Sequence, residues 1–240
     1  GNSPGVIIES THGTDLAKPS EPGDFSYVMP GRASWSWALM KDGSVNYEVQ
    51  KDFISYASEM GWEYCLVDVN WDTTIVWDKL AELARMAAEK KVGLIVWYNS
   101  AGDWNTVPYH PKDKLLTHES RKAEFSRLEQ MGIKGIKVDF FGGDGQSMMD
   151  YYQDILADAH KHHLMVNCHG STLPRGLHRT WPNLVSMEAI RGFEFATFDQ
   201  ESANKVPSKA ATLAFIRNAF DPMDFTPVCF TAYDNFERVT

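Results

Sequence analysis

The sequence predicts an α/β fold, a (β/α)8 TIM barrel that is truncated before its eighth strand. Short apolar runs rich in β-branched and aromatic residues alternate with helical segments along the whole chain. This alternation is typical of βαβ units and a parallel sheet. An open doubly wound sheet usually has a glycine-rich phosphate turn after its first strand, and this sequence has none. A closed barrel therefore explains the pattern better.

The length and composition fit one large domain. The chain has 240 residues, of which 43% are hydrophobic, and single-domain α/β barrels commonly reach this size. Residues 1–30 are rich in Gly, Pro and Ser and are expected to form an irregular lead-in. We assign residues 31–240 to the partial catalytic barrel.

Seven strands are expected, each an apolar run next to a turn or a helix. They cover residues 33–39, 64–71, 93–99, 133–141, 164–169, 184–189 and 221–229. Helices are expected between them, where apolar residues recur at helical spacing or Ala, Leu and Glu are frequent. They cover residues 46–60, 77–90, 115–131, 147–162 and 207–218. Gly61 and Gly132 follow two of these helices and act as stop signals.

The charge and aromatic content restrict the function. The formal net charge of −9 argues against nucleic acid binding, which needs clustered Lys and Arg. No apolar run is long enough to span a membrane. Eight Trp in a non-basic protein fit stacking on sugar rings, although most of them are expected to serve the core.

The cysteines carry no clear function. Cys65, Cys168 and Cys229 each lie in an apolar run, so buried free thiols are expected. An odd number of cysteines without CxxC spacing indicates neither a disulfide framework nor a zinc site.

Polar residues gather where the predicted strands end. Active sites of such barrels lie at the carboxyl ends of the strands. The polar residues and tryptophans there are Trp37, Asp68, Asn70, Trp97, Asn99, Asp139, Asn167, His169, Glu188, Glu194 and Asp224. Carboxylates, amides and Trp together are typical of glycosidases, which use two carboxyl groups and many hydroxyl-binding groups.

Asp139 is the strongest single candidate. It ends the apolar run GIKVDFF, and a charged group there is costly unless it faces a polar site. Lys137 lies two residues earlier, so both side chains are expected on one face of the strand. The alternative is an Asp that caps a helix or only pairs with Lys137.

Two further carboxylates remain ambiguous at this point. Glu188 ends a strand and Glu194 lies in the loop beyond it, on either side of Arg191. One is a candidate general acid, and the other a metal ligand or a partner of Arg191. Two solvated loop carboxylates are the plain alternative, and the spacing alone cannot choose.

The histidines divide into two sets. His160, His162 and His163 end a predicted helix, where cations complement the helix dipole, and this explanation is favoured over a zinc site. His169 ends the fifth strand beside Asn167 and is a candidate lining residue. The sequence has no GxSxG, P-loop or HExxH motif, which disfavours serine, nucleotide and zinc hydrolases.

Four segments together resemble glycoside hydrolase family 97: PGRASWSW, the strand end VDFF, the run RTWPNLVSMEAIRGFE and the late PMDFTP. The resemblance implies a bacterial α-glucosidase or α-galactosidase. It also implies a (β/α)8 barrel between an N-terminal β-sandwich and a C-terminal β domain, an active-site calcium and a periplasmic location. One calcium ligand would come from the sandwich, so calcium is expected to be weak or absent in this chain alone.

The resemblance also assigns the residues. Inverting members carry a Glu after the His that follows the fifth strand, whereas this chain has Gly170 there and Asp139 on the fourth strand. This implies a retaining, α-galactosidase-like enzyme with Asp139 as nucleophile and Glu194 as general acid/base. It further implies that Glu188 and Glu194 hold calcium.

We expect four residues to contact the substrate: Asp68, Trp97, Lys137 and His169. The predicted function is cleavage of terminal α-galactosides on oligosaccharides through a covalent glycosyl-enzyme. An α-glucosidase with the same machinery and a non-catalytic carbohydrate-binding relative are the alternatives.

Overall fold

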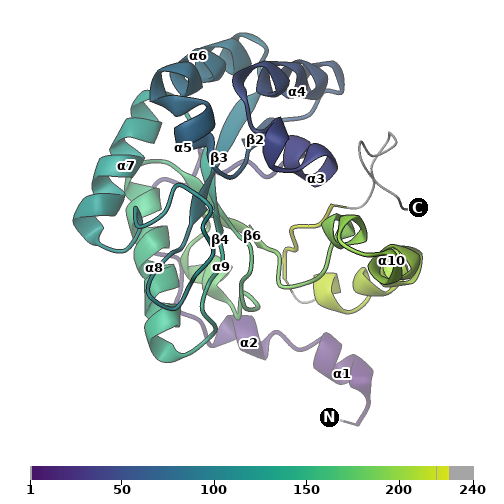
Figure 1. The fold of residues 1–240 in the computed structure, drawn as a ribbon. Helices are drawn as coiled ribbons and strands as arrows, with labels where there is room; N and C mark the ends of the chain where they lie inside the picture. The colour runs from purple at the N-terminus through teal and green to yellow at the C-terminus, as the bar shows by residue number, and fades with distance from the viewer. Residues whose placement is uncertain (1, 220, 227–240) are drawn as a thin grey trace.

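The computed structural model describes residues 2–219 and 221–226. Six strands form one sheet in the order β1-β2-β3-β4-β5-β6, and every neighbouring pair is parallel. The strands are β1 Ala33–Trp35, β2 Tyr64–Val67, β3 Gly93–Asn99, β4 Gly135–Asp139, β5 Met165–Cys168 and β6 Leu184–Met187. The sheet curls with helices around its outside, as in part of a (β/α)8 barrel (Figure 1). The predicted fold class is confirmed.

Four helices of three or more turns connect successive strands along the outer layer (Figure 1). They are α4 Tyr47–Glu59, α6 Val76–Glu89, α7 His118–Gln130 and α8 Gln146–Lys161. Asn46 caps α4 by accepting the Val49 N–H, and Thr117 caps α7 by accepting the Ser120 N–H. All four lie within one residue of the predicted bounds, except that α7 begins at His118 and not at residue 115.

The core lies between the sheet and these helices. Val67, Val96 and Ile136 on the strands are fully buried, as are Ile54 and Phe125 on the helices. Because both faces of a parallel sheet are covered, its strands are nearly continuous apolar runs. A charged residue within such a strand is therefore exceptional, and Lys137 is one.

Several predicted strands are shorter than expected. The segment 33–39 is a strand only to Trp35 and continues as α3 Ser36–Met40, and the segment 64–71 ends at Val67, before α5 Trp71–Thr74. Asp68 Oδ1 accepts the Val69 N–H at 2.8 Å, and Asp139 Oδ1 accepts the Phe140 N–H at 2.8 Å. Such local bonds take the backbone away from the strand ladder. They end β2 and β4 where the site begins.

The last predicted helix is displaced. α10 runs over Gln200–Leu213, so it begins before Pro207 and contains it. Asp199 starts the helix by accepting the Ser202 N–H at 2.7 Å. The capping bond, not the proline, determines where this helix begins.

The predicted seventh strand is described only in part. Met223 forms a single parallel bridge with Met187 of β6, which places this segment beside the sheet edge. The rest of the predicted strand from residue 227, with Cys229, lies outside the described residues. Cys65 and Cys168 are buried free thiols, as expected.

The lead-in is more regular than predicted. It contains the short helices α1 Pro4–Ile8 and α2 His12–Asp15. The remaining short elements are η1 Asp42–Ser44, α9 Leu177–Thr180, η2 Phe193–Thr197 and η3 Arg217–Ala219. Within the described residues no helix has the length and apolarity to cross a membrane.

Candidate active site

The carboxyl ends of β2, β3 and β4 bring four predicted site residues together. The register pairs Trp97 with Lys137 across β3 and β4. Lys137 Nζ lies 3.0 Å from Asp68 Oδ2 and 3.9 Å from Asp139 Oδ2. Trp97 Nε1 donates to Asp139 Oδ2 at 3.3 Å. We call Asp68, Trp97, Lys137 and Asp139 the β2–β4 group, and its geometry confirms that Lys137 and Asp139 share one face.

Lys137 is a buried cation between carboxylates, with only 2% of its surface exposed. Its Nζ lies 4.3 Å from the centre of the Trp35 ring, and Trp35 Nε1 donates to Asp68 Oδ2 at 2.7 Å. Burial alone would lower the pKa of Lys137, but the charges of Asp68, Asp139 and Glu194 raise it above its ordinary value. The ammonium therefore stays charged between the carboxylates of Asp68 and Asp139.

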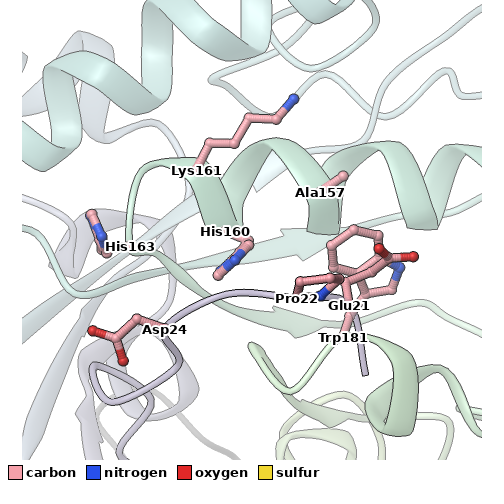
Figure 2. Close-up of a pocket in the computed structure, with 8 residues that line it drawn as sticks. All are labelled: Glu21, Pro22, Asp24, Ala157, His160, Lys161, His163 and Trp181. Carbon is pink, nitrogen blue, oxygen red and sulfur yellow. The ribbon is translucent and has the colours of Figure 1, made fainter. Parts of the chain in front are cut away.

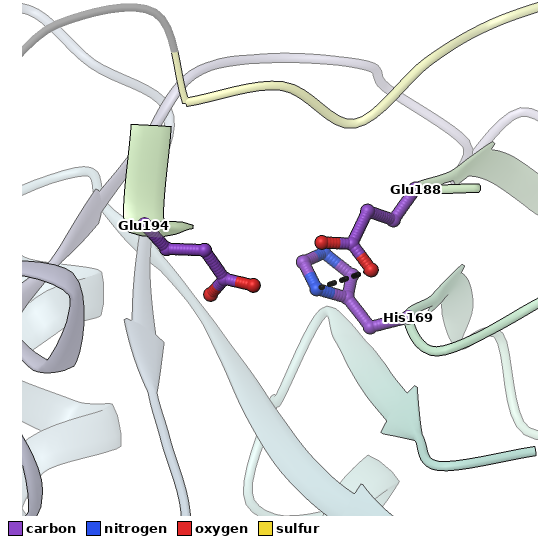
Figure 3. A group of neighbouring side chains, drawn as sticks. All are labelled: His169, Glu188 and Glu194. Atoms are coloured by element: carbon purple, nitrogen blue, oxygen red, sulfur yellow. Dashed lines mark ion pairs between the residues drawn. The ribbon is translucent and has the colours of Figure 1, made fainter. Parts of the chain in front are cut away.

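A second set of residues follows β5 and β6. One atom each of His169, Glu188 and Glu194 lies within 4.8 Å of the other two. His169 Nδ1 is 3.6 Å from Glu188 Oε2, and that oxygen accepts the Gly170 N–H at 3.1 Å. Figure 3 shows the Glu194 side chain reaching toward this pair from a different element, η2.

The two glutamates differ in their surroundings. Burial, together with the charges of Glu188 and Asp139, raises the pKa of Glu194 to about 7, against the opposing charges of Lys137 and His169. A carboxyl group with a pKa near neutrality can both give and take a proton at physiological pH. Glu188 differs in its surroundings, because its Oε2 accepts the Gly170 N–H.

Asp224 joins this set, although no role was predicted for it beyond its place at a strand end. His169 Nε2 donates to Asp224 Oδ2, and the Asn167 side-chain amide donates to the same oxygen at 2.7 Å. Burial and Lys137 would lower the pKa of His169, but its bond to Asp224 raises it to about 9. We call His169, Glu188, Glu194 and Asp224 the β5–β6 group. In the sequence, the feature that marks Asp224 is its position in the PMDFTP run, at a strand end.

Hydrogen bonds of Arg217 hold the segment before Asp224 beside the sheet. Arg217 Nη2 donates to the Met187 carbonyl at 2.9 Å, and Arg217 Nη1 donates to the Asp221 carbonyl at 3.0 Å. Arg217 is only 6% exposed. Its buried side chain therefore joins β6 to the segment that precedes Asp224. The long separation in sequence explains why no local pattern revealed this contact.

The predicted calcium ligands can be tested against calcium chemistry. Calcium takes oxygen ligands, carboxylates above all, and Glu188 and Glu194 offer them within 4.8 Å of each other. Their mutual repulsion contributes to the raised pKa of Glu194, and a divalent cation would relieve it. His169 is a nitrogen ligand, which transition metals accept more readily than calcium. The two carboxylates therefore fit the ion, and the imidazole does not add to the fit.

The other histidines lie elsewhere, as expected. His160 and His163 line a cavity of about 430 Å³ between the lead-in and the end of α8, with Asp24 and Trp181 (Figure 2). His163 Nδ1 also lies 2.7 Å from Glu129 Oε1. Because α8 ends where β5 begins, this cavity is at the opposite end of the sheet from the carboxylates.

Known proteins resemble the chain along most of its length. The family model for glycoside hydrolase 97 matches residues 31–190. A probable retaining α-galactosidase of Streptomyces bingchenggensis is 36% identical over 94% of this chain and 34% of its own length. A retaining α-galactosidase of Bacteroides thetaiotaomicron is 32% identical over 88% of this chain and 32% of its own length. The chain thus spans about a third of these relatives.

A solved structure is also similar to this chain. The crystal structure of a β-arabinopyranosidase superposes with a TM-score of 0.87 and 42% identity, over 91% of this chain and 35% of that one. The barrel strands, the family match and the two curated relatives lead to the same assignment. The chain belongs to glycoside hydrolase family 97.

Proposed function

We propose that this chain is the catalytic part of a retaining glycoside hydrolase that cleaves terminal α-galactosides. Asp139 attacks the anomeric carbon while Glu194 gives its proton to the departing glycosidic oxygen. A covalent glycosyl-enzyme forms, and Glu194 then takes a proton from the water that hydrolyses it. Lys137, Asp68, Trp97 and His169 are proposed to bind sugar hydroxyls around these two groups.

The close approach of Gly170 to Asp139 is the observation that carries this proposal. Gly170 has a φ of +51°, and a Cβ there would lie 3.0 Å from Asp139 Oδ1 and 2.9 Å from the Phe140 nitrogen. A Glu at this position, as the resemblance implies for inverting enzymes, would crowd the Phe140 backbone and the end of the Asp139 side chain. The backbone here therefore suits Gly170 and not the Glu of an inverting enzyme, and the carboxylate at this end of the site is Asp139 on β4.

The fixed orientation of Asp139 supports the same role. Its Oδ1 accepts the Phe140 N–H at 2.8 Å, and its Oδ2 accepts the Trp97 indole N–H at 3.3 Å. Phe140 has a φ of 67°, which bulky residues adopt only where the surrounding structure requires it. A nucleophile held in one orientation needs little rearrangement to reach the anomeric carbon.

The stereochemistry of the first product tests the mechanism. Proton NMR of the full-length protein with an aryl α-galactoside should show α-galactose before mutarotation produces the β-anomer. If β-galactose appears first, the enzyme inverts and the assignment of Asp139 as nucleophile is wrong.

A β-arabinopyranosidase is the second candidate, because the 42% identical structure is named for that activity. A β-L-arabinopyranoside has the ring configuration of an α-D-galactoside without its hydroxymethyl group, so one machinery serves both. The ratio of kcat/KM on the two aryl glycosides separates the candidates. A matching aryl α-glucoside tests the α-glucosidase alternative, and binding without turnover of any of them would favour a non-catalytic relative.

We propose calcium as the cofactor, held by Glu188 and Glu194. When bound, it would supply positive charge beside the two carboxylates and polarise a nearby hydroxyl. Calorimetric titration of chelator-treated full-length protein with calcium chloride should show saturable binding that Glu188→Gln weakens. Equal heats for both proteins would reject Glu188 as a ligand.

The cellular setting follows from the resemblance alone. We propose that N- and C-terminal β domains flank the barrel and that the protein acts in the periplasm on oligosaccharides. Cell fractionation tests the location, and a purely cytoplasmic signal would refute it.

A further inference from the structure

Lys41 combines an unusual backbone with a contact to the acid/base turn. It follows α3 with φ 61° and ψ −160°, a conformation that only glycine adopts readily. Its N–H donates to the Trp37 carbonyl at 2.9 Å. Its own carbonyl accepts both the Ser44 N–H at 3.0 Å and the Ser44 hydroxyl at 2.7 Å. Three hydrogen bonds therefore hold this backbone in place.

A buried polar network fixes Ser44 in turn. Ser44 Oγ lies 2.9 Å from Ser36 Oγ, and the Gln50 side-chain amide donates to Ser36 Oγ at 2.9 Å and to the Ser44 carbonyl at 3.0 Å. Ser36, Ser44 and Gln50 are each at most 1% exposed. The Gln50 side-chain nitrogen therefore links Ser36 to Ser44 beneath Lys41, whereas Gln50 Oε1 has no hydrogen-bond partner among the described residues.

The Lys41 side chain extends over aromatic rings to the η2 turn. Its Nζ lies 4.3 Å from the centre of the Trp37 ring and 4.8 Å from that of Phe198. The ammonium donates to Thr197 Oγ1, and that hydroxyl donates to the Glu194 carbonyl. Thr197 is 3% exposed, so this link is shielded from water.

The link matters because the Glu194 side chain is held only weakly. Among residues 2–219 and 221–226, the neighbours that act on its carboxylate, Lys137, His169, Glu188 and Asp139, do so through charge. Its position therefore depends on the backbone of η2, which Lys41 holds through Thr197. General acid catalysis requires the proton donor within hydrogen-bond reach of the departing oxygen.

We propose that Lys41 is a positioning residue that holds η2 so that Glu194 can reach the glycosidic oxygen. This inference rests on the proposed function. Loss of the ammonium lets η2 shift, and a displacement of about 1 Å costs on the order of 10²-fold in rate. The loss falls on proton transfer, so it should grow as the leaving group becomes more basic.

The experiment compares two α-galactosides in the full-length enzyme. Lys41→Met should lower kcat/KM on an alkyl α-galactoside by about tenfold or more, because its departing alkoxide needs the proton. On 2,4-dinitrophenyl α-galactoside, whose leaving group needs none, the change in kcat/KM, which reports the first displacement alone, should stay below about twofold. Thr197→Val should give the same pattern, and the double variant should lose no more than either single variant.

Lys51→Met is the matched control. Lys51 also lies over a ring, 5.4 Å from the centre of Tyr47, and pairs with Glu48 at 2.7 Å, but it belongs to α4 on the outer layer. Equal losses on both glycosides, or no loss, for Lys41→Met would overturn the inference while leaving the proposed function intact. If the wild-type enzyme cleaves neither glycoside, the proposed function fails and the inference falls with it.

Discussion

The two sides of the site are built differently. In the β2–β4 group, strand residues hold one another directly: Lys137 lies 3.0 Å from Asp68, and Trp97 donates to Asp139. In the β5–β6 group, Glu194 comes from the η2 turn and faces its neighbours mainly through charge. A nucleophile needs a fixed direction, whereas an acid/base needs an adjustable proton affinity. The two constructions are consistent with the roles proposed for Asp139 and Glu194.

The β2–β4 group and the β5–β6 group also differ in their charges. One buried ammonium, Lys137, lies within 3.9 Å of the carboxylates of Asp68 and Asp139. On the other side, the imidazole of His169 stands among three carboxylates. Burial raises the pKa of Glu194 most, and the negative charges of Glu188 and Asp139 raise it further.

Removing the nucleophile should have the largest effect. Asp139→Gly is expected to lower kcat on an aryl α-galactoside by on the order of 10⁴-fold or more, because the first displacement has no nucleophile. Sodium azide should restore turnover, and the product should be β-galactosyl azide, identified by NMR. An active variant, or an α-azide product, would show that Asp139 is not the nucleophile.

How far the sequence predicted this arrangement depends on how local each signal is. Asp139 stood out because a charge at the end of an apolar strand is a local feature. Glu188 and Glu194 could not be separated, because their difference comes from burial and from neighbours on β4 and β5. Asp224 was recognised only as a strand-end residue, since its partner His169 is far away in sequence.

The fold shows the same limit. The positions of six strands were predicted from apolar runs, but the strands predicted at 33–39 and 64–71 are longer than the observed ones. The Asp68 carboxylate captures the next backbone N–H and ends its strand. Side-chain bonds of this kind depend on orientation, which apolar periodicity does not contain.

The acid/base should give the second largest effect. Glu194→Gln is expected to lower kcat/KM on alkyl α-galactosides by about 10²–10⁴-fold. In the wild type, Glu194 must be protonated for the first step, and its pKa is raised to about 7. Activity should therefore be high below this pH and fall as the pH rises through it.

A pH profile of kcat/KM on both proteins checks this. On an alkyl α-galactoside, whose departure needs the acid, the wild type should show the alkaline limb and the residual activity of Glu194→Gln should not. A limb that persists unchanged in the variant would belong to another group.

Asp224→Asn should have an intermediate effect by releasing His169. We expect about a tenfold loss in kcat/KM, and a free energy of unfolding lower by about 2 kcal/mol at pH 6, since a hydrogen bond between charged partners is lost. The folded pKa of His169 is raised to about 9. The stabilisation of the fold by the His169–Asp224 pair is thus complete below the ordinary pKa of 6.5 and is lost as the pH rises through 9.

Urea unfolding at pH 6 and pH 10 measures the difference. The difference in the free energy of unfolding between wild type and Asp224→Asn should be smaller at pH 10 than at pH 6. A gap that is constant or widens would mean that the two residues do not form an ion pair in the folded protein.

Trp97→Phe should have the smallest effect and tests the β2–β4 group most finely. The substitution keeps a buried ring but removes the N–H that Asp139 accepts at 3.3 Å, so kcat/KM should fall about fivefold, as for one long hydrogen bond of about 1 kcal/mol. Trp71→Phe is the matched control, because Trp71 Nε1 donates to the Trp97 carbonyl at 2.8 Å, not to a site carboxylate. It should lower stability to a similar extent without changing kcat/KM. Equal activity losses in both variants would mean that Trp97 acts through packing alone, and the rigid side of the site would then depend on Lys137 and the strand backbone.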